Sequence, residues 1–119
     1  MSTTIYTVRC VLKRPAEIAE AIKAGNRFRA GSMTGAPAFY GMDTSRQHGQ
    51  LRPIVYLLPS ERIALEHCDY VIFSYATPIA WRNSVNGYWY CPGLGYSNTT
   101  SRHQAVAKRV IVQLTGALP

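Results

Sequence analysis

The chain has 119 residues, so we expect a single globular domain spanning residues 1–119 that buries a core without disulfides or metals. Hydrophobic residues make up 47% of the sequence, and no run approaches the ~20 apolar residues of a membrane span, which argues against a disordered chain and against a membrane protein. Lys and Arg outnumber Asp and Glu by 13 to 6, and the resulting net charge of +7 favours an anionic partner such as nucleic acid.

The first part of the chain predicts a strand followed by a helix. Thr4–Leu12 is rich in β-branched and aromatic residues, which favour strands. Pro15 suits the first position of a helix, and Ala16–Ala24 has high helix propensity. Gly25 then provides a C-terminal stop, because glycine readily adopts the left-handed conformation that ends many helices.

The middle of the chain predicts loops, one strand and one helix. Asn26–Gly35 is basic and punctuated by glycine, but its spacing does not match a Walker phosphate loop. Asp43–Gly49 has the composition of a polar loop. Leu51–Leu58 predicts a strand that Pro53 confines to a sheet edge or a bend, and Ser60–His67 predicts a short helix.

The clearest strand signal follows. Tyr70–Tyr75 is a strongly β-prone run, and Thr77–Pro78 predicts a bulge or kink before the strand resumes over Ile79–Val85. Asn86–Gly87 is a strong hairpin-turn signal, because both residues tolerate positive φ, and Tyr88–Cys91 forms the returning strand.

The last predicted element is a helix that begins at Ser101. Ser101 and Gln104 match a capping box, in which each side chain bonds to the other residue's backbone N–H. Val110–Val112 is β-prone, so we expect a short helix that gives way to a strand. Together these elements predict an α+β domain: a small, mainly antiparallel sheet centred on the Tyr70–Cys91 hairpin, with two or three helices, one of them packed on a sheet face.

The start of this last helix has two interpretations. Free backbone N–H groups at a helix N-terminus, together with the Arg102 guanidinium, can bind a phosphate. Alternatively, Thr99, Thr100 and Ser101 only cap the helix, which accounts for the hydroxyl groups but not for Arg102 or His103.

His103 also has two interpretations. It can act as a general acid or base in a hydrolase or transferase that uses Ser101 or Thr100, and Thr99 and Cys91 are further candidate nucleophiles. However, no Asp or Glu follows Asp69, so an orienting carboxylate must come from the first part of the chain. A histidine on the apolar face of a helix is more often a hydrogen-bonded core residue, and we prefer that interpretation.

The cysteines and histidines predict neither a metal site nor a cofactor. Cys10, Cys68 and Cys91 are scattered, with no CxxC pair and no disulfide framework, which fits a reduced, cytoplasmic setting. His67 and Cys68 could bind a metal together with His48 or Cys10, but the spacings between these residues match no zinc-binding signature.

Aromatic residues are concentrated in the last fifty residues. Tyr70–Pro119 carries no Asp or Glu, and Arg82 lies among the aromatic residues of the predicted hairpin. Rings on strands can stack nucleic-acid bases, although cross-strand packing explains the same pattern. The aromatic residues concerned are Tyr70, Phe73, Tyr75, Trp81, Tyr88, Trp89 and Tyr90.

Two blocks carry a resemblance to a known kind of domain. DYVIFSYATPIAW (residues 69–81) and YSNTTSRHQ (residues 96–104), with RFR and GSMTG upstream, resemble an uncharacterised domain family of small proteins from actinobacterial phages and mobile elements. The resemblance implies a phage or prophage protein acting in a bacterial cytoplasm. It supplies no activity and no catalytic residues.

Three functions therefore stand as hypotheses. The first is a small basic phage-type protein that binds nucleic acid or another anion. The second is a host-takeover module that binds a bacterial protein through an exposed apolar patch. The third is the hydrolase or transferase that uses His103. The predicted anion-binding residues are Arg27, Arg29, Arg82, Thr99, Thr100, Ser101, Arg102, His103 and Arg109.

Overall fold

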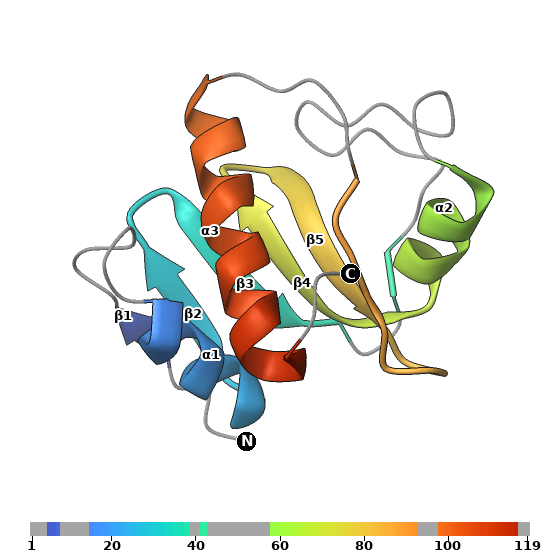
Figure 1. Ribbon diagram of the computed structural model, residues 1–119, viewed down its shortest axis with the longest axis horizontal. Helices are drawn as coiled ribbons and strands as arrows, with labels where there is room; N and C mark the ends of the chain where they lie inside the picture. The colour runs from blue at the N-terminus through green and yellow to red at the C-terminus, as the bar shows by residue number, and fades with distance from the viewer. Residues whose placement is uncertain (1–4, 8–14, 39–40, 43–57, 93–97, 117–119) are drawn as a thin grey trace.

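The computed structural model describes residues 5–7, 15–38, 41–42, 58–92 and 98–116 (Figure 1). These ranges contain three helices: α1 (Pro15–Lys23), α2 (Pro59–Glu66) and α3 (Asn98–Thr115). They also contain the strands β1 (Ile5–Thr7), β2 (Arg27–Ala30), β3 (Met33–Pro37), β4 (Cys68–Ser74), β5 (Thr77–Asn83) and β6 (Trp89–Tyr90).

The strands form one sheet in the order β1-β2-β3-β4-β5-β6, so each strand pairs with its neighbours in the sequence. The five strands from β2 to β6 are antiparallel, whereas β1 runs parallel to β2, with α1 as the crossover between them. A parallel pair needs such a crossover, because a tight turn can join only antiparallel strands. The predicted α+β class and mainly antiparallel sheet are therefore confirmed.

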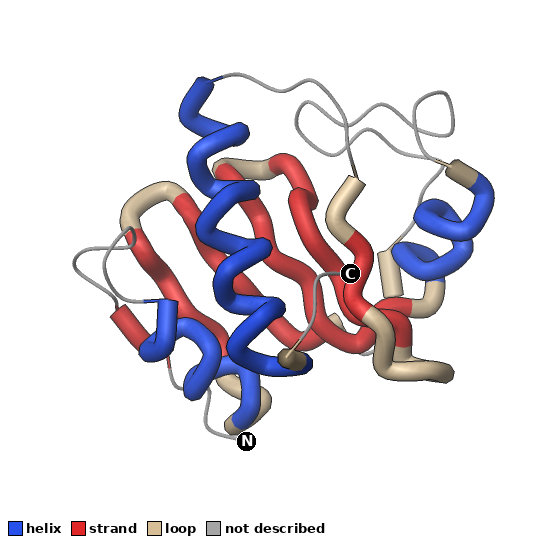
Figure 2. The backbone as a smooth tube through the Cα atoms, in the orientation of Figure 1, coloured by secondary structure: helices blue, strands red, loops and turns tan. Residues whose placement is uncertain are grey.

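The helices lie on both faces of the sheet. Helices α1 and α3 pack side by side on one face, which we call the helical face, and the main core lies between them and the strands (Figure 2). Strand residues alternate between faces, so Tyr70 and Ile72 enter this core while Val71 points the other way. On the opposite face Val71 and Trp81 pack with α2 in a second, smaller cluster.

The first helix matches its prediction. Pro15 occupies its first position, and the predicted end at Gly25 is confirmed by a φ of 70° there. Ile18 and Ile22, one turn apart, are both fully buried against the sheet. The N–H of Asn26 then donates to the Ala21 carbonyl at 2.9 Å, which closes the helix end before β2 begins.

The hairpin of β2 and β3 falls in a segment for which the sequence predicted no strand. Ala30 pairs with Met33 around the two-residue turn Gly31–Ser32, in which Gly31 has a φ of 64°. Strand β2 buries alternate residues, with Phe28 and Ala30 in the core and Arg27 and Arg29 exposed. The basic segment is therefore an amphipathic strand of the sheet.

The β4–β5 connection contains the predicted bulge and, in addition, a reversal of the chain that the sequence did not predict. The chain reverses at Tyr75–Ala76, so Thr77–Pro78 already belongs to the returning strand, and Ser74 pairs with Thr77. The register shifts between Ile72 and Phe73, and this bulge lies beside Pro78, which has no N–H to donate to the ladder. The predicted bulge is therefore confirmed, but the chain also reverses just before it, so the two segments are separate strands of a hairpin.

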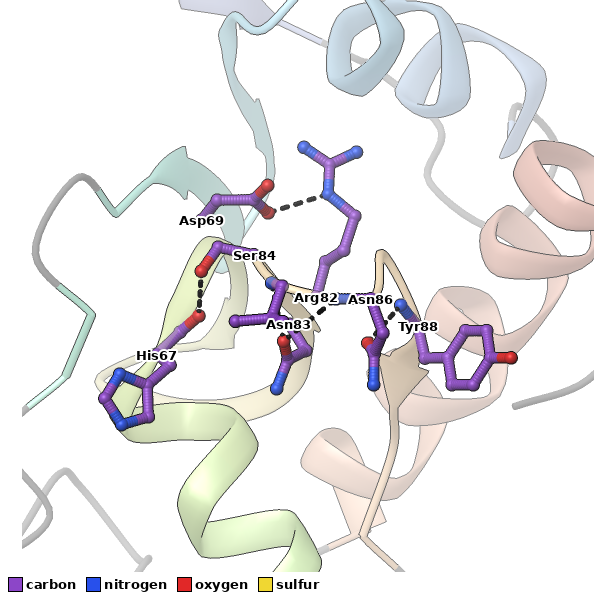
Figure 3. A network of polar contacts seen from close by, with 8 residues as sticks. His67, Asp69, Arg82, Asn83, Ser84, Asn86 and Tyr88 are labelled. Carbon is purple, nitrogen blue, oxygen red and sulfur yellow. Dashed lines mark hydrogen bonds and ion pairs between the residues drawn. The ribbon is translucent and has the colours of Figure 1, made fainter.

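The predicted turn at Asn86–Gly87 is confirmed. Gly87 has a φ of 73°, and the Asn83 side chain accepts the N–H groups of Val85 and Asn86 at 2.7 and 3.3 Å. Figure 3 shows Asn83 and Asn86 at the turn between β5 and β6.

Helix α3 begins earlier and ends later than the sequence predicted. It starts at Asn98, so Ser101 lies inside the helix, and the predicted Ser101–Gln104 capping box is wrong. The Gln104 side chain instead donates to the Pro92 carbonyl. The predicted change to a strand at Val110–Val112 is also wrong, because burial of Val110 and Ile111 on the helical face outweighs their β propensity.

The predicted helix at Ser60–His67 is confirmed as α2, which starts one residue earlier at Pro59. Of the strand predicted at Thr4–Leu12, the structure describes Ile5–Thr7, which form β1. The predicted loop at Asp43–Gly49 and nearly all of the predicted strand at Leu51–Leu58 lie outside the described residues. None of the described helices combines the length and the apolar character needed to cross a bilayer.

The contact between Gly35 and Phe28 gives a stability prediction. A Cβ at position 35 would overlap the buried Phe28 ring, 2.7 Å from its Cδ1 atom. Gly35→Ala is expected to lower the free energy of unfolding by about 1–3 kcal/mol, because a close-packed core accepts an added methyl group poorly. Urea denaturation of the purified variant measures this loss.

The double variant Phe28→Leu/Gly35→Ala is the control. Because leucine vacates part of the ring position, the double variant is expected to lose less stability than the sum of the two single variants. Strictly additive losses would contradict the contact as the cause.

Candidate functional site at the β4–β5 turn and helix α3

A cluster of buried polar side chains joins the end of β4 to α3. Ser74 Oγ lies 2.7 Å from His103 Nδ1 and 3.2 Å from Thr100 Oγ1. Ser74 and Thr100 are fully buried and His103 is 7% exposed. Thr100 and His103 are one helical turn apart, so both side chains reach the same strand end.

The serine hydroxyl has one hydrogen, which fixes how the cluster shares its protons. When Ser74 donates to Thr100 Oγ1, His103 must carry its proton on Nδ1 and donate to Ser74. When Ser74 donates to Nδ1 instead, the Thr100 hydroxyl must be the donor to Ser74. Both arrangements satisfy Ser74 and His103 in their neutral forms, which suits a buried site.

Burial also controls the charge of His103. Desolvation lowers the pKa of His103 below its ordinary value of 6.5, so the imidazole is neutral at pH 7. The preferred sequence interpretation, a hydrogen-bonded histidine on the apolar face of a helix, agrees with this geometry.

The same geometry does not favour a hydrolase. Ser74 Oγ bonds to the imidazole but has no exposed surface from which to attack a substrate. Ser101 is exposed on α3, and burial raises the pKa of Cys91 to about 11, which keeps that thiol protonated. Across the part of the chain that the structure describes, no group of three or more His, Cys, Asp and Glu side chains is placed to hold a metal.

Tyr75, next to this cluster, has an unusual backbone. It has a φ of 54° and is the one non-glycine residue with positive φ in the described ranges. The equivalent position of the β2–β3 turn is Gly31, which adopts such a φ without steric cost. A bulky side chain in this conformation costs about 1–2 kcal/mol, and strain of this kind is concentrated at functional sites.

Neighbouring groups hold the strained turn in place. The N–H of Tyr75 donates to the Ser32 carbonyl at 2.8 Å, which joins the two hairpin turns. The Tyr75 ring lies with its centroid 6.3 Å from that of the His103 ring, at an interplanar angle of 44°. The tyrosine is nevertheless 63% exposed, so most of the ring faces solvent.

The predicted arginines fall into three separate environments. Arg27 and Arg29 are exposed on the sheet face opposite α1 and α3. Arg102 and Arg109 are exposed on α3, on the other side of the sheet. The structure therefore does not bring these two pairs together.

The third environment is that of Arg82. Its Nε donates to Asp69 Oδ1 at 2.7 Å (Figure 3). Its guanidinium lies 5.6 Å from the centroid of the Trp89 ring. The Arg82 guanidinium, which the sequence analysis assigned to anion binding, thus already contacts the Asp69 carboxylate and the Trp89 ring.

The remaining predicted residues lie along the first two turns of α3. Thr99 and Ser101 are exposed, whereas Thr100 is buried in the Ser74 cluster with His103. Sequence reasoning missed Ser74 as their partner and did not single out Tyr75 from the other aromatic residues. The block DYVIFSYATPIAW contains both residues, but their roles depend on a contact with a helix almost thirty residues away.

Comparison with known proteins places this site inside a domain family. A family model described as a family of unknown function (DUF8033) matches residues 16–108, so the chain belongs to that family. The match extends from α1 into α3 and includes the β4–β5 turn. No match was found among curated proteins or solved structures.

The buried imidazole predicts a pH-dependent stability. Below pH 6.5 the unfolded chain protonates His103 while the folded protein does not, so the free energy of unfolding falls as the pH drops toward the lowered folded-state pKa. Each pH unit in that window is expected to remove up to about 1.4 kcal/mol. Urea denaturation between pH 7 and pH 5 measures the slope.

Two variants identify the histidine responsible. His103→Gln removes the titrating group and is expected to flatten this slope. His67→Gln changes an exposed histidine at the end of α2 and is expected to keep it. Equal slopes in the wild type and His103→Gln would show that another group causes the effect.

Proposed function

We propose that this protein binds nucleic acid and that the exposed side of α3 makes the contact. The observation that carries the proposal is the charge of this helix: it has no acidic residue over its 18 positions and exposes Arg102, Lys108 and Arg109. Phosphate groups supply most of the non-specific affinity for nucleic acid, and they are bound by Lys and Arg side chains.

The spacing of these cations suits a phosphate backbone. Arg102 and Arg109 are seven residues apart, so they lie on one flank of α3, about 10 Å from each other along its axis. Lys108 is one turn after Gln104, so both lie toward the other flank. The Gln104 side chain on that flank donates to the carbonyl of Pro92, just after β6. Two planar guanidinium groups on one flank can bind phosphates of the same strand.

The proposed setting is a bacteriophage or mobile element within a bacterial cytoplasm. It rests on the resemblance of the residue 69–81 and 96–104 blocks to small proteins of actinobacterial phages. Small basic proteins that act on phage or host nucleic acid fit that setting.

A protein-binding function is the second candidate, and one observation favours it. Val85 and Tyr88 are 86% and 67% exposed, so two large side chains of the β5–β6 turn face solvent. A bacterial partner bound there would remain attached in a pull-down from nuclease-treated lysate. Loss of all partners after nuclease treatment would favour nucleic acid instead.

Salt dependence tests the proposed nucleic-acid contact. Arg102→Gln and Arg109→Gln are each expected to weaken binding and to reduce the slope of log K against log salt by about one, because each removes a phosphate contact. Fluorescence anisotropy with labelled DNA and RNA at several salt concentrations measures both quantities.

Arg62→Gln is the matched control. It removes the same charge from α2, which packs on the opposite face of the sheet, and it is expected to leave the slope unchanged. Absence of binding at low salt, or the same loss in all three variants, would contradict a specific contact through α3. The variant Arg27→Gln/Arg29→Gln tests the opposite face in the same assay.

A further inference from the structure

We propose that the preferred ligand is single-stranded nucleic acid and that one unpaired base stacks on the exposed ring of Tyr75. This inference rests on the proposed function, because it assumes that α3 contacts the phosphates. It adds two points to that function: the ligand is single-stranded, and Tyr75 contacts one of its bases.

The first argument is that the fold does not need a tyrosine at this position. The turn between Ser74 and Thr77 requires a residue with positive φ, and glycine meets this requirement in the neighbouring β2–β3 turn. The Tyr75 side chain is 63% exposed, so its burial offsets little of the backbone strain. The ring therefore serves a purpose outside the packing of the core.

The second argument is that the ring is held ready for a ligand. Its backbone N–H is bound by the Ser32 carbonyl, and the preceding Ser74 is fixed by His103 and Thr100. The His103 ring lies beside the tyrosine and supports it from the side of the core. An exposed ring on an anchored turn loses little conformational entropy when a base stacks on it.

The third argument concerns the chemistry of the neighbourhood. Arg102 is exposed and adjoins His103 in the sequence, and the His103 ring is the one that lies beside Tyr75. Proteins that bind single strands combine these two features, with cations on the phosphates and rings on the bases. A duplex keeps the faces of its bases stacked inside, where a tyrosine on a turn does not reach them.

Binding of a labelled oligothymidine and of a labelled DNA duplex tests the inference by anisotropy. The wild type is expected to bind the single strand at least tenfold more tightly. Tyr75→Gly is expected to weaken single-strand binding by roughly 5- to 150-fold, the range found when a stacking ring is removed, and to leave duplex binding unchanged. Tyr75→Phe keeps the ring and is expected to bind like the wild type.

Two controls make the result specific. Tyr88→Gly removes an equally exposed tyrosine from the β5–β6 turn and is expected to leave single-strand affinity unchanged. Thermal unfolding of Tyr75→Gly is expected to show a melting temperature at or above that of the wild type, since glycine relieves the strained φ.

The outcomes separate the two proposals. Equal affinity for single strand and duplex, or wild-type affinity in Tyr75→Gly, would overturn the stacking inference and leave nucleic-acid binding through α3 standing. Failure of the wild type to bind either ligand at low salt would overturn both. Equal losses in Tyr75→Gly and Tyr75→Phe would also overturn stacking, because phenylalanine retains the aromatic face.

Discussion

The packing of α3 against the sheet is the contact on which the other features depend. Val106, Val110 and Ile111 are buried on the helical face, and this apolar stripe fixes the rotation of the helix about its axis. With the rotation fixed, Thr100 and His103 meet the end of β4, and the charged residues of the helix remain exposed. A buried polar cluster and a cationic surface are thus two consequences of one hydrophobic contact.

Local signals in the sequence predicted the elements that local chemistry controls. The first helix, the second helix, the β4 strand and the Asn86–Gly87 turn follow from propensity, periodicity and turn residues. The β2–β3 hairpin was missed although Gly31–Ser32 is a two-residue turn signal, because the basic and glycine residues around it masked the alternation of Phe28 and Ala30. The reversal at Tyr75–Ala76 was missed for a different reason. This turn contains no glycine, so Pro78 was the only residue nearby that indicated a break in the strand.

The candidate site was predicted in part, and the missing part is non-local. Thr100 and His103 stood out by residue type, but their partner Ser74 is supplied by a strand 26 to 29 residues earlier. The same applies to Arg82, whose ion pair with Asp69 forms across a bulge between two strands that the sequence describes only separately. Composition gives the sign and size of the charge, whereas the face on which each charge lies depends on strand register and helix rotation.

The hydrogen bond between Tyr75 and Ser32 has a consequence for how the chain tolerates changes in length. It ties together two hairpin turns, so a residue inserted in either turn would displace the other and pull Ser74 away from the imidazole. The β5–β6 turn, by contrast, satisfies its backbone through the side chain of Asn83 and lies exposed. We therefore expect inserted residues to be tolerated there, at the end of the sheet away from α3's first turn (Figure 1).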